Sequence, residues 1–425
     1  MEDTLSLISW NVTGRCNLSC KHCYLPAGRD DGITGNELRT DEALKVIDRI
    51  AIVNSEVMLI LSGGEPLMRK DIFELAAYAS GKGMMVVVGS NGILIDEAVA
   101  SGLRRSGVAG VSISLDSVDP EIHDDARSCT GSWERAVRAV GICRDAGISV
   151  QINAFVTKRN YGELPQLIEY SRSLGAKVFS PFFLVCTGRG EELTDITPEQ
   201  YEEILSFVVE TGGKCDGMMI RTRCAPTFRR ILYQEDPGSS LLKMESGRCL
   251  AGLRYCRITP EGDVTPCPYL PLPAGNVRTI DFHDIWRNSD VFASLRERSP
   301  KGRCLRCEFR LLCGGCRARA HALRKDYLAE DPWCAYIPGG GDAIEPPSFA
   351  PSFPNVGSHQ SGSEGTTIWT GSAEERLKKV PFFVRSMVRA AVERYAVEKG
   401  CREVTPEMME ELKQRAGVMG GMSGH

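Results

Sequence analysis

Three cysteines near the start of this 425-residue chain constrain what it can be more than any other feature. They are Cys16, Cys20 and Cys23, spaced C-x3-C-x2-C directly after a strand-like run, Leu5 to Val12. Three thiolates on one short loop can hold three irons of a cubane cluster and leave the fourth iron without a protein ligand. Because an open iron can bind a small molecule, the spacing predicts an iron–sulfur site with a vacant coordination position.

The same spacing would also place the three cysteines on one face of a helix, where free cysteine is often buried. Against this, Gly14, Asn17 and Ser19 favour turns, and Lys21 and His22 would be poor neighbours for a buried face. We therefore interpret the segment as a loop that holds a cluster.

This loop, with His22 before its last cysteine and Tyr24 after it, resembles the signature loop of the radical S-adenosylmethionine (SAM) enzymes. The resemblance implies that Cys16, Cys20 and Cys23 hold a catalytic [4Fe-4S] cluster, that SAM chelates its open iron, and that Tyr24 lies in the cofactor site. In that family, reductive cleavage of SAM gives a 5′-deoxyadenosyl radical that abstracts hydrogen from the substrate. The chain would then be a radical SAM oxidoreductase or lyase.

The composition limits the class of protein further. With 42% hydrophobic and 25% charged residues, the chain can bury a large core in two or three domains. A net charge of -4 gives no general attraction to nucleic acid or to an anionic membrane. The first residues, M-E-D-T, lack the basic character of a secretory signal, and no apolar run is long enough to span a bilayer. We expect a cytoplasmic protein whose seventeen cysteines bind metal instead of forming disulfides.

Short β-rich runs alternate with helical patterns from Leu5 to about Val209, as expected for βα units around a parallel sheet. The candidate strands are Leu5 to Val12, Val57 to Leu61, Met84 to Gly89, Gly110 to Leu115, Ile148 to Phe155 and Lys177 to Leu184. Capping residues such as Asp41 and Asp71 begin several of the intervening helices, and glycines end others. Six repeats predict an α/β fold with a partial (β/α)6 TIM-type barrel over residues 1–212, although a doubly wound open sheet would show the same alternation.

In a parallel barrel, the loops that follow the strands build the active site. The second strand ends in S-G-G-E-P, where Gly63 and Gly64 let a ligand approach the backbone and Glu65 offers a carboxylate to a cationic group. This segment resembles the radical SAM Gly-Gly-Glu motif, which holds the SAM ammonium group. Segments after the next strands resemble those that approach SAM elsewhere in the family, but could equally be strand ends with capping side chains. Their candidate cofactor contacts are Asn91, Ser114 and Asn153.

Several arginines follow the sixth strand. Arg189 lies in a Gly-Arg-Gly turn and could place a cation near an acidic substrate. Four more arginines surround Cys224 in the segment 213–247, which we expect to be a linker. They are Arg221, Arg223, Arg229 and Arg230. A solvated basic stretch is the simpler interpretation, but the position between two metal-binding regions keeps carboxylate binding open.

Eight cysteines form a second field between Arg248 and Tyr336. They are Cys249, Cys256, Cys267, Cys304, Cys307, Cys313, Cys316 and Cys334. Eight thiolates fit two fully ligated four-iron clusters or two tetrahedral zinc sites, and spacing alone does not choose between them. Because the region is short and rich in turns, bound metal would also stabilise its fold.

The order of these cysteines resembles the auxiliary-cluster (SPASM) domain that follows many radical SAM barrels, here over residues 248–337. The resemblance implies two auxiliary [4Fe-4S] clusters that transfer electrons. The first would be held by Cys249, Cys256, Cys267 and Cys316, and the second by Cys304, Cys307, Cys313 and Cys334. Two residues separate Cys313 from Cys316 where the family commonly has three, which leaves the division of these two cysteines between the clusters open.

Six cysteines belong to no such group: Cys129, Cys143, Cys186, Cys215, Cys224 and Cys401. Cys143 and Cys401 have helix-like surroundings, which is typical of packing residues. Cys186 and Cys224 lie in segments that could border the substrate, where a thiol could donate or accept hydrogen.

Residues 338–367 are rich in Gly, Pro and Ser without periodicity, which predicts a flexible linker. Beyond it, a helical domain over 368–417 begins with an amphipathic pattern from Ala373 to Lys399, and a second helix starts at Thr405 and Pro406. The expected apolar face, which should dock on the main body or on a partner, is Phe382, Phe383, Met387, Val388, Val392 and Tyr395.

The tail from V-P-F-F-V-R at 380–385 to V-T-P-E at 404–407 resembles the helical domain of protochlorophyllide reductase subunits. Its Arg385 and Arg389 lie one turn apart and could pair with propionates, although a solvated helix face is the simpler interpretation. Segments at 11–15, 183–190 and 316–320 resemble the radical SAM enzymes of haem d1 synthesis and of the siroheme-dependent haem pathway. Two resemblances thus favour a tetrapyrrole substrate whose propionate or acetate side chain is lost or oxidised, with a flavodoxin or ferredoxin as the electron donor.

Two other functions remain open. A peptide-modifying radical SAM maturase, which forms a thioether or oxidises a residue, would carry the same auxiliary domain. A peptide-recognition winged helix would support that function, and the sequence contains none. A non-catalytic zinc-binding scaffold would carry the same cysteines, and metal analysis distinguishes it from the enzymes.

Overall fold

The computed structural model divides into two units, Met1–Pro347 and Ser348–His425, which are described separately. In the first unit it describes residues 5–25, 35–192, 196–212, 215, 217–243, 248–297 and 299–346. In the second unit it describes residues 368–378, 380, 388–389, 392–393, 395–396, 399, 401 and 403–412.

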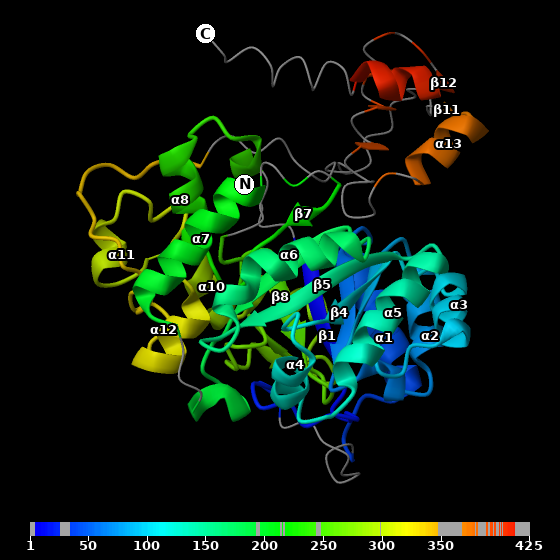
Figure 1. Ribbon diagram of the computed structural model, residues 1–425, viewed down its shortest axis with the longest axis horizontal. Coiled ribbons are helices and arrows are strands. Elements are labelled where there is room, and N and C mark those ends of the chain that lie inside the picture. The colour runs from blue at the N-terminus through cyan, green and yellow to red at the C-terminus, as the bar shows by residue number, and fades with distance from the viewer. Residues whose placement is uncertain are drawn as a thin grey trace. The chain divides into compact units, whose positions relative to one another are not determined.

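A ten-stranded sheet forms the centre of the first unit (Figure 1). Its first six strands are β1 (Leu7–Thr13), β2 (Met58–Gly63), β3 (Met85–Ser90), β4 (Gly110–Ser114), β5 (Ser149–Val156) and β6 (Val178–Phe183). The helices between and after them are α1 (Thr40–Val53), α2 (Ile72–Gly81), α3 (Glu97–Arg105), α4 (Pro120–Arg127), α5 (Ser132–Asp145), α6 (Leu164–Ser173) and α7 (Pro198–Gly212). These strands pair in parallel in chain order. The predicted α/β fold with a partial barrel is therefore confirmed.

The sheet has more than six strands because segments beyond the predicted barrel join both of its ends. β7 (Met219–Ile220) pairs with β6, and β8 (Tyr255–Ile258) pairs in parallel with β1. β8 continues into the antiparallel strands β9 (Asp263–Thr265) and β10 (Gly275–Asn276). The expected linker 213–247 thus contains β7 and helix α8 (Thr227–Glu235), which buries its apolar residues against the main core.

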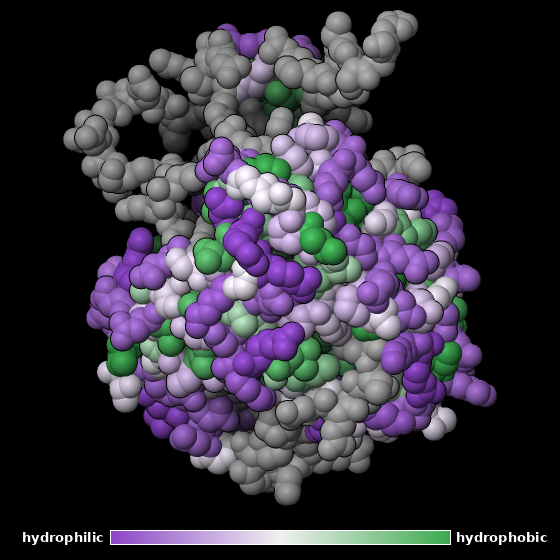
Figure 2. Space-filling model, turned by 90° about the vertical axis from the view of Figure 1, so that its left-hand side faces the viewer, coloured by the Kyte–Doolittle hydropathy of each residue, from purple (hydrophilic) through white to green (hydrophobic). Residues whose placement is uncertain are grey.

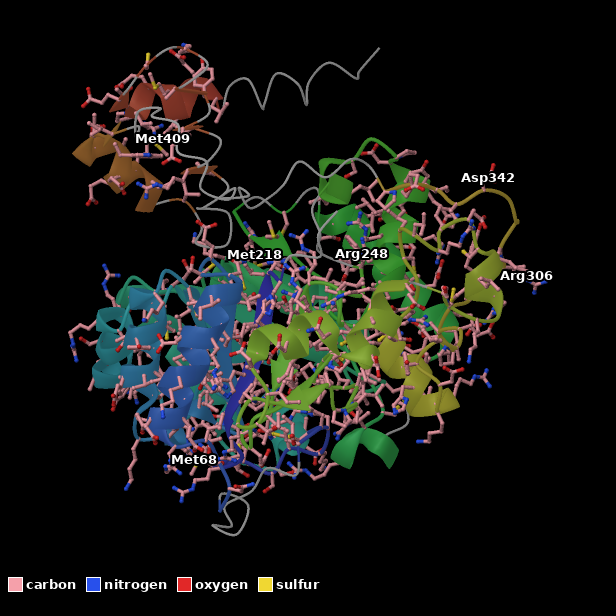
Figure 3. All side chains as sticks on the ribbon, turned by 180° about the vertical axis from the view of Figure 1, so that it is seen from behind. Met68, Met218, Arg248, Arg306, Asp342 and Met409 are labelled. Carbon is pink, nitrogen blue, oxygen red and sulfur yellow. The ribbon has the colours of Figure 1, made fainter. Side chains whose placement is uncertain are left out.

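Shorter helices complete the first unit. They are η2 (Pro66–Met68), η3 (Tyr161–Glu163), η4 (Gly188–Glu192), η5 (Ser240–Lys243), α9 (Phe282–Asn288), α10 (Asp290–Glu297), α11 (Arg303–Arg306) and α12 (Arg317–Arg324). Figure 3 shows the described side chains on this framework, seen from the opposite side to Figure 1.

The two faces of the sheet differ in chemistry. On the face that the helices cover, the strands contribute buried apolar side chains, among them Ile8, Trp10, Leu59, Leu61, Val88, Ile113 and Ile152. Successive residues of a strand point to opposite faces, so the register assigns the alternate residues to the inner face. Several of the residues on the inner face are small or polar. They are Ser9, Asn11, Ser62, Ser112, Ser114, Gln151, Asn153 and Ser180.

On the face drawn in Figure 2, hydrophilic residues predominate and hydrophobic residues are scattered. Among the residues that the structure describes, no helix has the length and apolar composition that crossing a bilayer requires.

The second unit has a small core of its own. β11 (Ile368–Trp369) pairs in parallel with β12 (Glu403–Val404), and α13 (Gly371–Lys378) follows β11. The buried side chains that pack together are Ala373, Leu377, Val392, Ala396, Val404 and Met409. Much of the expected docking face lies outside the described residues, namely Phe382, Phe383 and Met387.

Arg389 does not present a free guanidinium to propionates as its spacing suggested. It pairs with Glu374 and with Glu393, at 3.2 Å for Glu393, and it lies over the ring of Trp369. These contacts stabilise the second unit itself. Arg385, its expected partner in propionate binding, lies outside the described residues.

Candidate active site

The loop after β1 brings three thiols together. Cys16 and Cys20 are buried, Cys23 is partly exposed, and all three pack with Leu18 and Leu25. Burial raises the pKa of Cys16 to about 12, and nearby negative charges, including those of Cys20 and Cys23, add to the shift. Three adjacent thiolates are therefore unfavourable unless positive charge is bound among them, as the irons of a cluster would provide. This donor set fits a cluster held by three cysteines.

A buried ion pair supports this loop from the side of α4. Arg127 donates to both carboxylate oxygens of Asp116, at 2.7 and 2.9 Å, and its third nitrogen lies 3.8 Å from Sγ of Cys20. Burial alone would raise the pKa of Asp116, but the charge of Arg127 holds that pKa well below its usual range. Arg127 therefore places a fixed positive charge beside a candidate cluster ligand. Arg127 was not among the expected site residues, because α4 is a helix of eight residues that the sequence pattern did not predict.

His22, between the last two cysteines of the loop, is a neutral packing group. Its ring stacks on Phe155 at 4.5 Å between centroids. Burial and the charge of Arg127 lower the pKa of His22 to about 4, so it carries no charge at neutral pH.

Arg189, in the turn after β6, braces the cysteine loop. Its Nε donates to the carbonyl oxygen of Cys20 at 2.8 Å, and its backbone N–H donates to the carbonyl oxygen of Cys23 at 2.9 Å. A Cβ at Gly188, where φ is +59°, would lie 2.6 Å from that same Cys23 oxygen. The Gly-Arg-Gly turn thus holds the loop in place, a role that the sequence analysis did not propose for it.

The two glycines at the end of β2 are required by the cysteine loop. Gly64 N–H donates to Thr13 at 2.8 Å, and the next N–H, of Glu65, donates to Arg15 at 2.7 Å. A Cβ on Gly63 would lie 2.3 Å from the Thr13 oxygen, and one on Gly64 would lie 2.1 Å from the Arg15 oxygen. Only glycine lets the strand end approach the loop this closely.

The Glu65 carboxylate joins the ends of β2 and β3. It is fully buried and accepts hydrogen bonds from Ser90 Oγ at 3.0 Å, Asn91 N at 2.8 Å and Leu67 N at 3.2 Å. Burial raises the pKa of Glu65 to about 7. Contact of this motif with the SAM ammonium group stays a prediction.

The remaining candidate SAM contacts lie at the same end of the sheet. Asn91 follows β3 and donates through Nδ2 to the side chain of Asn17, in the cysteine loop, at 2.7 Å. Ser114 and Asn153 are register partners at the ends of β4 and β5. The positions fit a cofactor that lies over the loop, and contact with SAM stays a prediction for each residue.

Tyr24 connects the loop to the second cysteine field. Its hydroxyl accepts a hydrogen bond from Asn11 at 3.0 Å, and its ring meets Tyr269 edge to face at 5.0 Å. It packs both with the cysteine loop and with a cluster that contains Cys267 and Cys316. Aromatic side chains therefore separate the first group of thiols from the second.

The second group contains three of the four cysteines expected to hold the first auxiliary cluster. Cys249, Cys267 and Cys316 pack together, and the fourth thiol among them is that of Cys224. Burial raises the pKa of Cys267 well above its usual value, and the charges of the other three thiols raise it further. The structure does not bring Cys256 to this group, because Cys256 pairs with Ile8 of β1 and is buried in the main core.

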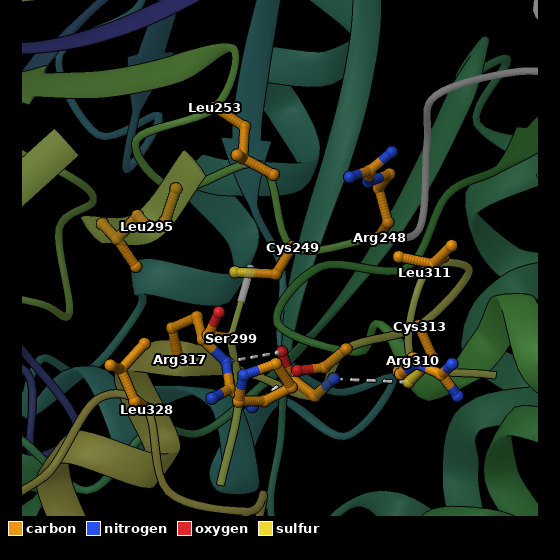
Figure 4. Close-up of a pocket in the computed structure, with 14 residues that line it drawn as sticks. Arg248, Cys249, Leu253, Leu295, Ser299, Arg310, Leu311, Cys313, Arg317 and Leu328 are labelled. Atoms are coloured by element: carbon orange, nitrogen blue, oxygen red, sulfur yellow. Dashed lines mark hydrogen bonds between the residues drawn. The ribbon is translucent and has the colours of Figure 1, made fainter. Parts of the chain in front are cut away.

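The third group is Cys304, Cys307, Cys313 and Cys334, the set expected for the second auxiliary cluster. Burial raises the pKa of Cys313, and the nearby charges of Cys334 and Cys304 add to the shift. Cys304 acts on Cys307 in the same way. One pocket is lined by Cys249 of the second group and Cys313 of the third, together with Arg248, Arg310 and Arg317 (Figure 4). The donor sets of both groups fit four-iron clusters.

The arginines of the expected linker divide into two kinds. Arg229 donates to the carbonyl oxygen of Leu242 at 2.7 Å, and Arg230 pairs with Glu202. Arg221 and Arg223 instead extend β7 beside Ser180 and Phe182, on the inner face of the sheet. Among the described residues, neither of these two guanidiniums has a carboxylate partner, and Nε of Arg221 is buried without a hydrogen bond. Burial and the charge of Arg223 lower the pKa of Arg221 to about 9.

A partial parallel barrel with a three-cysteine loop after β1, followed by two groups of four cysteines, defines a SAM-dependent radical enzyme with an auxiliary iron–sulfur domain. The sequence matches the Radical SAM superfamily over residues 10–170 and the Iron-sulfur cluster-binding (SPASM) domain over residues 249–308. Residues 369–413 match the Proto-chlorophyllide reductase 57 kD subunit family. The chain belongs to the radical SAM superfamily, and it is an enzyme that uses SAM and [4Fe-4S] clusters.

Within that superfamily its curated relatives include haem-forming enzymes. The AdoMet-dependent heme synthase of Methanosarcina barkeri is 39% identical over 348 residues, which cover 80% of this chain and 99% of the relative. The Fe-coproporphyrin III synthase of the same organism is 32% identical over 357 residues, covering 78% of this chain and 88% of the relative. Among solved structures, SuiB of Streptococcus suis bound to S-adenosylmethionine has a TM-score of 0.64 at 18% identity and 78% coverage of both chains, a similarity of fold.

Proposed function

We propose that this enzyme forms haem by removing carboxylate groups from propionate side chains of an iron-containing porphyrin. The proposal follows the names of the relatives, of which one makes haem and one makes Fe-coproporphyrin III. Coproporphyrin carries propionates where haem carries vinyl groups. A propionate side chain that loses one hydrogen atom, one electron and CO2 becomes a vinyl group, so the proposed reaction balances with one hydrogen acceptor and one electron acceptor.

The unpaired arginines of the inner face carry this proposal. Arg221 and Arg223 lie two residues apart on one strand, and hence on the same side of it. Two neighbouring guanidiniums without a carboxylate are costly in a partly buried position, and a bound carboxylate would offset that cost. Arginine also binds carboxylates with two parallel hydrogen bonds, which fixes the orientation of the ligand. A substrate with several propionates fits this charge pattern.

The neighbourhood of these arginines suits a flat aromatic substrate near the cysteine loop. Arg223 lies near Tyr255, a residue that packs with the second cysteine group. Tyr24 and Tyr269 line the same region, and Arg257 lies over the ring of Tyr24 at 5.6 Å. Aromatic and cationic side chains between two cysteine groups would hold a porphyrin by its face and its carboxylates.

We assign roles to the three cysteine groups on the same basis. Cys16, Cys20 and Cys23 would hold the cluster that binds SAM, and bound SAM supplies the hydrogen-abstracting radical. The second group, on the far side of Tyr24, would hold the acceptor of the electron that the substrate loses. The third group, Cys304, Cys307, Cys313 and Cys334, would pass this electron outward.

The zinc-scaffold alternative has less support. The matches to the Radical SAM superfamily over residues 10–170 and to the SPASM domain over residues 249–308 favour iron–sulfur clusters at these cysteines instead. The peptide-modifying alternative shares the fold but gives no role to the unpaired arginines.

The reaction needs a low-potential electron for each SAM cleavage. We propose a flavodoxin or ferredoxin as the donor and the cytoplasm as the compartment, because reduced thiols and low-potential clusters persist there.

Anaerobic assay of the reconstituted enzyme tests the proposal. With SAM, a reductant and iron-coproporphyrin III, mass spectrometry should detect haem and 5′-deoxyadenosine formed together. Cleavage of SAM without any change in this porphyrin or in other tetrapyrroles would contradict the proposal.

A further inference from the structure

We propose that Cys224, and not Cys256, is the fourth protein ligand of the auxiliary cluster nearest the barrel, together with Cys249, Cys267 and Cys316. The resemblance to the auxiliary-cluster domain had implied Cys256, and Cys224 was expected in a segment that could border the substrate. This inference depends on the family's auxiliary cluster and not on the identity of the substrate.

The four thiols lie in one buried group. Cys267 and Cys316 are buried in one side-chain cluster, and Cys224 and Cys249 pack against it. Cysteines from distant parts of the chain thus meet in one place, as the ligands of a single cluster must. A fourth thiol also closes the cluster, so that it serves electron transfer and leaves no iron open to substrate.

The register of β8 turns Cys256 away from this group. Cys256 pairs with Ile8 of β1, and both are fully buried in the core that the helices cover. The residue before it, Tyr255, packs with Cys267 and Cys316. Because successive residues of a strand point to opposite faces, Cys256 cannot reach the group that Tyr255 contacts.

The backbone of Cys224 is held in place by its surroundings. Its φ of +56° lies in the left-handed region, which a residue with a Cβ adopts only when its surroundings hold it there. Arg319 donates to the carbonyl oxygen of Cys224 at 2.5 Å and forms an ion pair with Asp331 at 3.2 Å. Asp331 in turn accepts the N–H of Cys316 at 2.8 Å. One buried ion pair thus fixes the backbone of two of the four cysteines.

This support also connects the cluster to the substrate region. Cys224 follows Arg223 directly, so a cluster bound to Cys224 would fix the strand extension that carries the unpaired arginines. The guanidinium of Arg319, which supports Cys224, also lies over the ring of Trp333, at 4.1 Å from its centroid.

Alanine substitution with iron spectroscopy tests the inference without any substrate. Three four-iron clusters give about twelve irons per chain. In Cys224→Ala we expect loss of about four irons, or a [3Fe-4S] signal by electron paramagnetic resonance after mild oxidation. Cys256→Ala is the matched control, because it also removes one buried thiol, and should keep about twelve irons and the wild-type spectrum.

Cys224→Ala could lose all its clusters through misfolding. Cys224→Ser is the second variant, which keeps the inference testable in that event. A serine oxygen can still bind iron, so Cys224→Ser should keep its iron and shift the spectrum of one cluster. A wild-type iron content and spectrum in Cys224→Ala or Cys224→Ser would overturn the inference. Loss of about four irons in Cys256→Ala, with the wild-type iron content kept in Cys224→Ala, would also overturn the inference. Either result would leave the proposed substrate untouched, since no tetrapyrrole enters the experiment.

Discussion

Replacing Gly64 by alanine should remove the cluster of the cysteine loop. Relief of the contact between the new Cβ and the Arg15 oxygen requires a move from 2.1 Å to at least 3.4 Å, a shift of about 1.3 Å. This shift breaks the hydrogen bonds that Gly64 and Glu65 donate to the loop, at 2.8 and 2.7 Å. Two lost hydrogen bonds at about 1 kcal/mol each, with about 1–3 kcal/mol for overpacking, give a total of about 3–5 kcal/mol.

The assay is the iron content of the reconstituted protein and the change that SAM causes in its electron paramagnetic resonance spectrum. Gly64→Ala should lose up to about four of twelve irons and lose the SAM-dependent change. Gly141→Ala is the control, because a Cβ in that position of α5 meets nothing within 4 Å. Alanine there should stabilise the helix by about 0.5–1 kcal/mol and leave the spectrum unchanged. Equal iron content and equal SAM response in both variants would refute the packing argument.

Three further predictions address charge. Changing Arg221 and Arg223 together to Gln should raise the KM for iron-coproporphyrin III about 10- to 100-fold, since a lost charge-assisted bond costs about 1.5–3 kcal/mol, and should spare substrate-free SAM cleavage; an unchanged KM would count against carboxylate binding. Arg127→Met removes the positive charge near Cys20, so redox titration should find a more negative potential for the barrel cluster, and an unchanged potential would show that this charge does not act on it. Burial lowers the pKa of His123 to about 4, below its unfolded value of 6.5. The unfolded chain therefore binds the proton more tightly, and the free energy of unfolding should fall by about 1.6 kcal/mol from pH 6.5 to 5. Urea titration should show a smaller fall in His123→Asn, and an equal fall would exclude His123 as its source.

Much of the architecture could be predicted because it depends on local patterns. The βα alternation predicted the parallel sheet, since the periodicity of apolar residues within each segment indicates a strand or a helix. The cysteine loop is equally local, because its three thiols lie within eight residues of each other, from Cys16 to Cys23. The glycines after β2 were singled out correctly, although their close neighbour is the loop backbone.

Other features could not be predicted because they depend on contacts between distant segments. The resemblance to the auxiliary-cluster domain grouped Cys256 with Cys249. The pairing of β8 with β1 sets the direction of the Cys256 side chain, and no local signal reveals that pairing. The position of Arg127 could not be predicted without α4. This helix has eight residues between β4 and α5, and its apolar pattern is too short to be recognised. The three donors that bind the Glu65 carboxylate could not be predicted either, because they come together only in the folded chain.

The register of β8 also shows how the missing ligand could have been found. A strand prediction for Tyr255–Ile258 with strict alternation would have separated Cys256 from its neighbours in the second cysteine group. Cys224 itself gives no spacing signal, because it lies 25 residues before Cys249 and reaches the group only through the fold.

The radical made at the cysteine loop should take hydrogen from a porphyrin propionate. Iron-coproporphyrin III with deuterium on its propionate carbons tests this step. We expect deuterium in the 5′-deoxyadenosine product and haem formed in step with it. Unlabelled 5′-deoxyadenosine together with an unchanged porphyrin would refute this step.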